Sequence, residues 1–268
     1  MPRLLVIGHG YLGQELARQA GRKGWEVIAV SRSGGPDSIA CDVGEPSTVA
    51  ALPTADWIVH CAASGRGGAE AYRHVYLEGC RNLTESFPET PLLFTSSTSV
   101  YHQTGGETVD ETSLAEPDRE TGMLLLDAER VVLSAGGTVA RLSGIYGPER
   151  SVLLKKFLNG EALIEEDGRR FLNQIHRDDA ASAILHLIEH KLCGVFNVCD
   201  SFPMSQVECY RAMAGHFGRP LPPSGPRDFT RKRGWTHKRV SNFKLRSSGW
   251  APEFPCFLDA LDQLKPAV

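Results

Sequence analysis

The chain has 268 residues, and its 29 Lys and Arg against 32 Asp and Glu give a formal net charge of −3. That length suits one large domain, or one domain with a small appendage, and 41% hydrophobic with 23% charged residues excludes wholesale disorder. The charge balance favours neither a nucleic-acid partner nor an anionic membrane. The apolar run at residues 4–7 is too short for a signal peptide or a membrane span. Seven cysteines without a C-x-x-C pair indicate reduced thiols in a cytoplasmic protein and no metal site.

Short apolar runs alternate with longer stretches of helical period, which is typical of a parallel sheet covered by helices. The predicted order is strand 3–7, helix 11–23, strands 26–30, 38–41 and 56–60, helix 69–87, strand 91–96, helix 118–135 and strand 138–142. The second half is less regular, with predicted helices at 151–158, 177–190 and 205–217 and a strand at 194–198. We therefore predict an α/β fold: a doubly wound parallel (Rossmann) sheet over residues 1–150, with a smaller C-terminal lobe, 151–268, that partly returns to the main sheet.

A glycine-rich hexad follows the first predicted strand and opens the first predicted helix, with the sequence Gly8-His9-Gly10-Tyr11-Leu12-Gly13. In a G-x-G-x-x-G pattern the first glycine permits the tight turn, the second lets a pyrophosphate approach the backbone, and the third lets helix and strand pack closely. The phosphates would lie on the free amide groups at the positive end of the helix. The hexad therefore predicts dinucleotide binding.

The residues after the second predicted strand indicate which dinucleotide is bound. An NAD site has Asp or Glu there, which accepts hydrogen bonds from the ribose hydroxyls, whereas this chain has Ser31-Arg32-Ser33. A guanidinium between two hydroxyls binds a 2′-phosphate through charge-assisted hydrogen bonds, and a carboxylate would repel it. We therefore predict NADP as the cofactor, with NAD less favoured. The alternative is that Arg32 is a solvated loop residue.

Further stretches repeat the motifs of one enzyme superfamily: Cys41-Asp42-Val43, His60-Cys61-Ala62-Ala63, Thr95-Ser96-Ser97-Thr98-Ser99-Val100-Tyr101, the run RLSGIYGP at 141–148 and the run IHRDDA at 175–180. With them the chain resembles the short-chain dehydrogenase/reductase superfamily, on the side of its extended nucleotide-sugar epimerases and dehydratases. The resemblance implies that Asp42 and Val43 contact adenine and that Ser97 is the active-site serine. It implies further cofactor contacts from Cys61, Ala62, Ala63, Thr95, Ser96 and Ser97.

The chain departs from that pattern in two places. Its glycine loop is one residue tighter than the usual G-x-x-G-x-x-G. The family also places Tyr and Lys four residues apart on one helix face, where the lysine lowers the pKa of the tyrosine for acid–base work. Alignment puts Thr121 and Leu125 at these positions, and no Tyr or Lys lies between residues 102 and 145. We predict that the dyad is absent, as in the atypical branch of the superfamily, which residues 238–250 also resemble.

A replacement for the dyad must come from segments near the nicotinamide. Ser97 can donate or accept a hydrogen bond but is a poor base unaided, and Tyr101 and Tyr146 are phenols that need a neighbouring cation to lower their pKa. We name these three as catalytic candidates, each with a structural role as the alternative.

Other polar residues are given structural roles from the sequence. His60 is assigned to packing. The resemblance of residues 175–180 implies that His176 and Asp178 order the second lobe, with capping of the helix that follows as the alternative for Asp178. The segment 227–246 carries eight Lys or Arg against one acid, Asp228. It is interpreted as a solvated surface, with the anion-facing rim of a substrate pocket as the alternative.

Together these patterns predict an NAD(P)-binding oxidoreductase, or an epimerase- or dehydratase-like enzyme, acting on a small polar substrate that is anionic or sugar-like. The alternative is a catalytically silent NADP-binding sensor or scaffold. Nucleic-acid binding by residues 227–246 is disfavoured, because basic residues there are not interleaved with aromatic ones at a recognised spacing. The sequence leaves a homodimer open.

Overall fold

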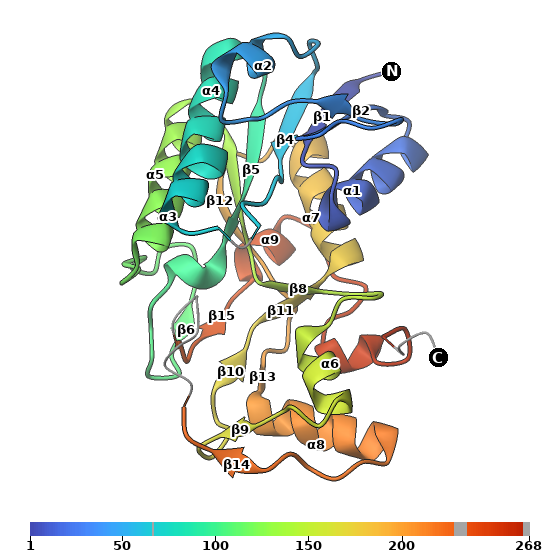
Figure 1. The fold of residues 1–268 in the computed structure, drawn as a ribbon, viewed down its shortest axis with the longest axis vertical. Coiled ribbons are helices and arrows are strands. Elements are labelled where there is room, and N and C mark those ends of the chain that lie inside the picture. Colours follow the sequence, from blue (N-terminus) through green and yellow to red (C-terminus); the bar gives the residue numbers. More distant parts are fainter. Residues whose placement is uncertain (66, 228–234, 265–268) are drawn as a thin grey trace.

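The computed structural model describes residues 1–65, 67–227 and 235–264, which form a main lobe and a smaller second lobe (Figure 1). The main lobe holds one seven-stranded sheet in which every neighbouring pair is parallel. Across the sheet the order is β12 (Gly194–Val198), β7 (Thr138–Leu142), β5 (Leu92–Ser97), β4 (Trp57–His60), β1 (Arg3–Ile7), β2 (Glu26–Ser31) and β3 (Ile39–Ala40). The strand order reverses between β1 and β4, as in a doubly wound Rossmann fold. The predicted fold class is confirmed.

Helices cover both faces of this sheet (Figure 1). On one face α1 (Tyr11–Arg22) packs against α7 (Arg177–Glu189). On the other face lie α3 (Ala69–Tyr72), α4 (Gly79–Ser86) and α5 (Glu120–Ser134), with the short α2 (Pro46–Ala50) against α4. Because both faces are covered, the central strands are buried on both sides, which explains why they are continuous apolar runs in the sequence.

The second lobe is built from helices and short strand pairs. Its core holds Tyr146, Phe157, Tyr210 and Phe257 among other apolar side chains. Its helical elements are α6 (Val152–Leu158), α8 (Gln206–Phe217) and the 3-10 turn η3 (Phe257–Ala260). The short helix α9 (Phe243–Ser247) instead packs against β12 of the main sheet. The paired strands of the second lobe are β8 (Gly144–Tyr146) with β11 (Gln174–His176), β10 (Phe171–Leu172) with β13 (Met204–Ser205), and β9 (Ile164–Glu165) with β14 (Ser224–Gly225). A further pair, β6 (Thr108–Val109) with β15 (Arg239–Val240), buries Val109 and Val240 in the core of the main lobe.

The helix predicted over 69–87 contains an unexpected π-helical stretch, η1 (Arg73–Glu78), between α3 and α4. The Val75 carbonyl in this stretch lies 2.9 Å from Nε2 of His60, at the end of β4. Since a carbonyl only accepts hydrogen bonds, Nε2 carries the proton. π-helical turns are common at functional sites, and this one brings Val75 and Tyr76 to the wall of a cavity.

Two elements from the second half of the chain complete the main lobe. The strand β12 pairs with β7, and α7 packs on α1.

Within the described residues, no helix is long and apolar enough to cross a membrane, and no group of three or more His, Cys, Asp or Glu side chains could hold a metal ion.

Candidate functional site

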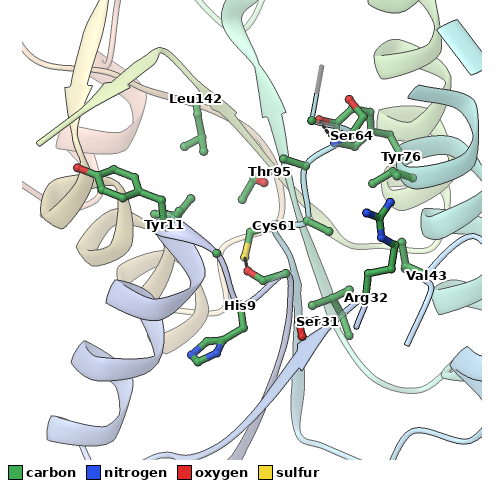
Figure 2. A pocket seen from close by; sticks show the side chains of 18 of the residues that line it. His9, Tyr11, Ser31, Arg32, Val43, Cys61, Ser64, Tyr76, Thr95 and Leu142 are labelled. Atoms are coloured by element: carbon green, nitrogen blue, oxygen red, sulfur yellow. Dashed lines mark hydrogen bonds between the residues drawn. The ribbon is translucent and has the colours of Figure 1, made fainter. Parts of the chain in front are cut away.

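A cavity of about 710 Å³, here called the first cavity, opens at the carboxyl ends of the central strands, at the point where the strand order reverses. Ligands of open α/β sheets bind in this place. Figure 2 shows His9, Tyr11, Arg32, Cys61 and Thr95 on its walls. The predicted cofactor residues, all except Gly13 and Ser33, line this cavity: Gly8, His9, Gly10, Tyr11, Leu12, Ser31, Arg32, Asp42, Val43, Cys61, Ala62, Ala63, Thr95, Ser96 and Ser97.

The three glycines of the hexad have different surroundings. Gly8 has a φ of +106°, and a Cβ on it would lie 2.3 Å from the Ala62 nitrogen. A Cβ on Gly13 would lie 2.1 Å from the Gly8 carbonyl oxygen, so this glycine allows α1 to pack against the loop. A Cβ on Gly10 would meet no atom within 4 Å, although the residue lines the cavity. The space beside Gly10 is therefore open for a ligand.

Two side chains add to the cavity wall beside the start of α1. Gly10 is the N-cap of this helix and supplies no side-chain cap, so the first-turn amides face the cavity without a side-chain acceptor. Tyr11 donates a hydrogen bond to the Pro148 carbonyl at 2.9 Å, which brings residues 147–150 over the loop. The Arg150 guanidinium lies over the Tyr11 ring, 5.0 Å from its centroid, and lines the cavity. The sequence reasoning missed Arg150, because it comes from a loop far along the chain.

The far end of the first cavity is formed by the residues after β2 and β3. Arg32 is exposed and forms no ion pair with any described residue. The Ser31 hydroxyl lies 3.0 Å from the Ser38 hydroxyl. Asp42 is paired with His74, whose Nε2 lies 2.8 Å from its carboxylate. The Arg32 guanidinium and the Ser31 hydroxyl therefore lie at this end of the cavity. The nearby Asp42 carboxylate is already paired with His74.

Cys61 lines the first cavity, and its thiol is engaged within the wall. Its thiol donates to the Gly8 carbonyl at 3.4 Å. Burial raises the pKa of this thiol to about 12, and the thiolate is the reactive form. Cys61 therefore links the two turns that hold the glycine loop.

The end of β5 reaches both the first cavity and a second one. Ser97 and Ser143 line both cavities. The Ser97 hydroxyl accepts a hydrogen bond from the Ser99 amide at 3.2 Å, which leaves its own proton for another acceptor. The second cavity has a volume of about 280 Å³ and lies toward the second lobe; Arg170, Asn173 and Lys238 are among its lining residues.

Neither candidate tyrosine lines the two cavities. The side chain of Tyr101 is fully buried; its hydroxyl donates to Asn197 Oδ1 at 3.0 Å and accepts from Arg141 Nη1 at 2.8 Å. Burial raises the pKa of Tyr101, and the Arg141 charge lowers it by less. Burial and then the Asp200 charge raise the pKa of Tyr146, which packs on Phe257. Of these two tyrosines, only Tyr101 has a cation beside it among the described residues, and its hydroxyl lies in a place closed to substrate.

The helix that would carry the dyad contributes an apolar side chain to the site. Leu125 of α5 lines the first cavity and is 4% exposed, and Leu124 and Ala128 are buried beside it. Thr121, one turn earlier, is half-buried and does not line either cavity. The part of the wall that Leu125 forms is therefore apolar.

The predictions for His60, for Asp178 and for the segment 227–246 have different outcomes. His60 is fully buried against Phe94, and burial lowers its pKa to about 4, as a packing role implies. The cap of α7 is His176, whose Nδ1 accepts from the Asp178 amide at 3.3 Å, so Asp178 as the N-cap was wrong. Of the basic segment 227–246, residues 228–234 lie outside the described part, but Lys238 is buried at the second cavity rather than on a solvated surface.

Comparisons with known proteins agree with this geometry. Residues 4–199 match the family described as the NAD dependent epimerase/dehydratase family. Protein YeeZ of Escherichia coli (strain K12) is 29% identical over 242 residues, 81% of this chain and 85% of that protein. A solved structure from Methylobacillus flagellatus, which its name places among NAD-dependent epimerases/dehydratases, is 28% identical with a TM-score of 0.80 and covers 98% of this chain and 97% of that chain. Human epimerase family protein SDR39U1 (isoform 2), solved with NADPH, is 22% identical with a TM-score of 0.83 and 98% coverage of each chain, a likeness that concerns the fold.

Proposed function

The chain belongs to the NAD-dependent epimerase/dehydratase family, and on that premise we propose that it is an NADP(H)-dependent oxidoreductase or epimerase-like enzyme. Its substrate in this proposal is small, polar and anionic, and its chemistry proceeds without a tyrosine–lysine dyad. The observation that carries the proposal is the meeting of the two cavities at Ser97 and Ser143. A dinucleotide in the first cavity would have its reactive end beside a polar pocket for substrate.

The first cavity has residues suited to each charged group of a dinucleotide. The amides at the start of α1 and the Arg150 guanidinium would hold the pyrophosphate, and the open side of Gly10 leaves room for it. Arg32 and Ser31 would bind a 2′-phosphate. The human relative was solved with NADPH, which is compatible with NADP, whereas the family description names NAD.

The residues of the chain orient the reactants. A bound nicotinamide would supply or accept the hydride. Ser97 has a hydroxyl proton to donate to a substrate oxygen, and on the wall shared by the two cavities it would lie between cofactor and substrate. Leu125 makes the neighbouring wall apolar, which would disfavour water beside the reacting atoms. Without a phenolate–lysine pair, the expected turnover is slow, because general acid–base catalysis typically contributes about 10²–10⁴-fold.

A second candidate function is a silent NADP-binding sensor or scaffold. The burial of Tyr101 and the apolar wall at Leu125 favour it, since both remove groups that titrate at the site.

One experiment separates the two. Calorimetry measures the affinity of the purified protein for NADPH and NADH. With a panel of small keto acids and aldoses, absorbance follows net oxidation of NADPH, and NMR follows epimerisation or dehydration of the sugar, in which the cofactor returns to its starting state. Binding with turnover of any panel member supports the enzyme. Tight binding without turnover across the panel, together with a protein partner recovered by pull-down, supports the sensor. Failure to bind either dinucleotide contradicts both.

A further inference from the structure

The lining of the second cavity has more positive than negative charge. Two basic residues, Arg170 and Lys238, line it, and no aspartate or glutamate is among its described lining residues. Arg170 is offset by Glu165, whose carboxylate lies 3.3 Å from its Nε. Lys238 forms no ion pair with any described residue. The remaining polar lining comes from hydroxyls and amides, including those of Ser97 and Gln174.

Lys238 is an unusual lysine because its side chain is only 3% exposed. Lysine is almost never buried unless it is paired, since desolvation penalises the ammonium ion. Its Nζ donates one hydrogen bond, to the Tyr101 carbonyl at 2.7 Å, and an ammonium group has three protons to donate. Burial lowers the pKa of Lys238 to about 8; the Arg170 charge lowers it further and the Glu107 charge opposes both.

The backbone around Lys238 is held firmly in place. The Asn173 side-chain amide donates to the Lys238 carbonyl at 2.9 Å, and its oxygen accepts from the Val240 amide at 2.7 Å. The following residues, Arg239 and Val240, pair with β6. The ammonium group is therefore presented from a rigid element, as a binding site requires.

We propose that the second cavity binds the anionic group of the substrate, a carboxylate or a phosphate, and that Lys238 is its direct anchor, with Arg170 as the second cation. The proposal rests on the proposed function, because the substrate lies in this cavity only if a dinucleotide occupies the first. The volume of about 280 Å³ lies just below the ~300–1,000 Å³ of sites for drug-sized ligands. It suits a compact hydroxy acid or a sugar derivative.

The test uses three probes that share one ring: D-glucose, D-glucuronate and D-glucose 6-phosphate. Their affinities are measured by calorimetry or ligand-observed NMR at constant ionic strength, with the protein free and saturated with NADPH. We expect at least one charged probe to bind about tenfold to a hundredfold more tightly than glucose, the range of one charge-assisted hydrogen bond. Preference for glucuronate identifies a carboxylate substrate, and preference for the phosphate ester identifies a phosphorylated one.

The matched variants are Lys238→Met and Lys244→Met. Lys244 lies in the same segment and its Nζ also donates to a carbonyl, that of Val195, at 2.7 Å, but it is exposed and outside the cavity. Lys238→Met should abolish the preference for charged probes, and Lys244→Met should preserve it. Lys238→Arg keeps the charge and should retain part of the preference. Melting temperatures of all variants show whether each is folded.

The pH dependence gives a second readout. Arg170, Glu107 and the neighbouring His237 are the charged and titratable groups around Lys238. The preference for charged probes should fall as the pH rises through about 8, where Lys238 loses its proton. Equal affinity for all three probes, no binding of the charged probes at millimolar concentration, or an unchanged preference in Lys238→Met would overturn the proposal. NADPH affinity, measured on the same samples, reports separately on the proposed function and should be unchanged in Lys238→Met.

Discussion

The Arg141 guanidinium and the Glu129 carboxylate form a buried side-on ion pair, with Nε 3.0 Å from Oε1 and Nη2 2.6 Å from Oε2. The Ser96 hydroxyl donates to the same carboxylate at 2.5 Å, and the other arm of Arg141 reaches the Tyr101 hydroxyl. The pair joins α5 to β7 and β5 directly beneath the site. Arg141, the first residue of the run 141–148, is therefore an internal support.

We therefore expect Arg141→Met to destabilise the protein by about 3–5 kcal/mol, because it leaves the Glu129 carboxylate buried without its partner. Chemical denaturation measures the change. The control is Arg130→Met, which removes an exposed pair with Asp127 of similar length, 2.6 Å, on the same helix. That change should be at most about 1 kcal/mol. Equal losses from the two variants would contradict the importance of burial.

Substitution of two hexad glycines by alanine should separate folding from ligand binding. Gly13→Ala places a Cβ 2.1 Å from the Gly8 carbonyl oxygen, so the melting temperature should fall markedly. Gly10→Ala meets no protein atom within 4 Å and needs no positive φ, so stability should change little. Calorimetry should nevertheless show a loss of NADPH affinity, because the methyl group occupies the space for the pyrophosphate. Undiminished affinity in Gly10→Ala would place the phosphates elsewhere.

Arg32→Glu should change the choice of dinucleotide. In the unmutated protein we expect NADPH to bind about tenfold to a hundredfold more tightly than NADH, the range of a charge-assisted hydrogen bond to the 2′-phosphate. The carboxylate of the variant should abolish or invert this ratio, since it repels the phosphate and accepts from ribose hydroxyls. Isothermal calorimetry with both cofactors provides the measurement. Equal affinities in the unmutated protein would contradict the NADP assignment.

A lysine introduced at Leu125 should harm the fold. Leu125 is 4% exposed, whereas Met123 on the same helix is 50% exposed. Leu125→Lys should lower stability by at least about 2 kcal/mol, because it buries a charge without a partner. Met123→Lys introduces the same side chain at the surface and should be nearly neutral. Unchanged stability of Leu125→Lys with tighter NADPH binding would mean that the cavity wall still accommodates the family's lysine.

His60 should make stability depend on pH. Burial lowers its pKa from 6.5 to about 4 in the folded protein, so between these values the unfolded chain binds more protons. The contribution of His60 is complete above pH 6.5 and is lost as the pH falls toward 4, amounting to about 3 kcal/mol. Burial raises the pKa of Asp179 to about 6 and acts in the opposite direction, so the comparison must be between variants.

His60→Gln keeps a side-chain donor for the Val75 carbonyl and cannot titrate. Its unfolding free energy should fall less steeply from pH 6.5 to pH 4 than that of the unmutated protein. His102→Gln, on a half-buried residue near Asp118, is the control. A parallel pH profile for His60→Gln and the unmutated protein would contradict the argument.

The fold could be predicted from the sequence because its clearest patterns are formed by residues that are close together in the chain. The apolar run of β1, the hexad and the helical period of α1 lie next to each other in the chain, so each confirms its neighbour. The capping box of Ser205 and Glu208 and the left-handed Gly218 mark both ends of α8 in the same way. The two-residue strands of the second lobe were missed, since a strand of that length has no period to detect.

The site could be predicted only in part from the sequence. A cavity wall is formed by residues that are far apart in the chain, and a local pattern does not show which of them meet. The motif that names Tyr101 says nothing of its burial, which follows from Asn197 and Arg141 on two other strands. Arg150 reaches the first cavity from a loop, and Lys238 reaches the second from the segment just before β15. The π-helical turn at Val75 could not be predicted, because the residues around it keep a pattern that is typical of an ordinary helix.

The position of β12 at the sheet edge has a consequence during synthesis of the chain. When β7 leaves the ribosome, its partner at residues 194–198 has not yet been made, and translation of the intervening residues at about 5–20 residues per second takes several seconds. During that interval the outer edge of β7 presents unpaired amides and carbonyls beside apolar side chains. Such an edge is open to pairing with another nascent chain. We therefore expect chains arrested before residue 194 to engage chaperones or to aggregate, and chains released after residue 198 to escape both.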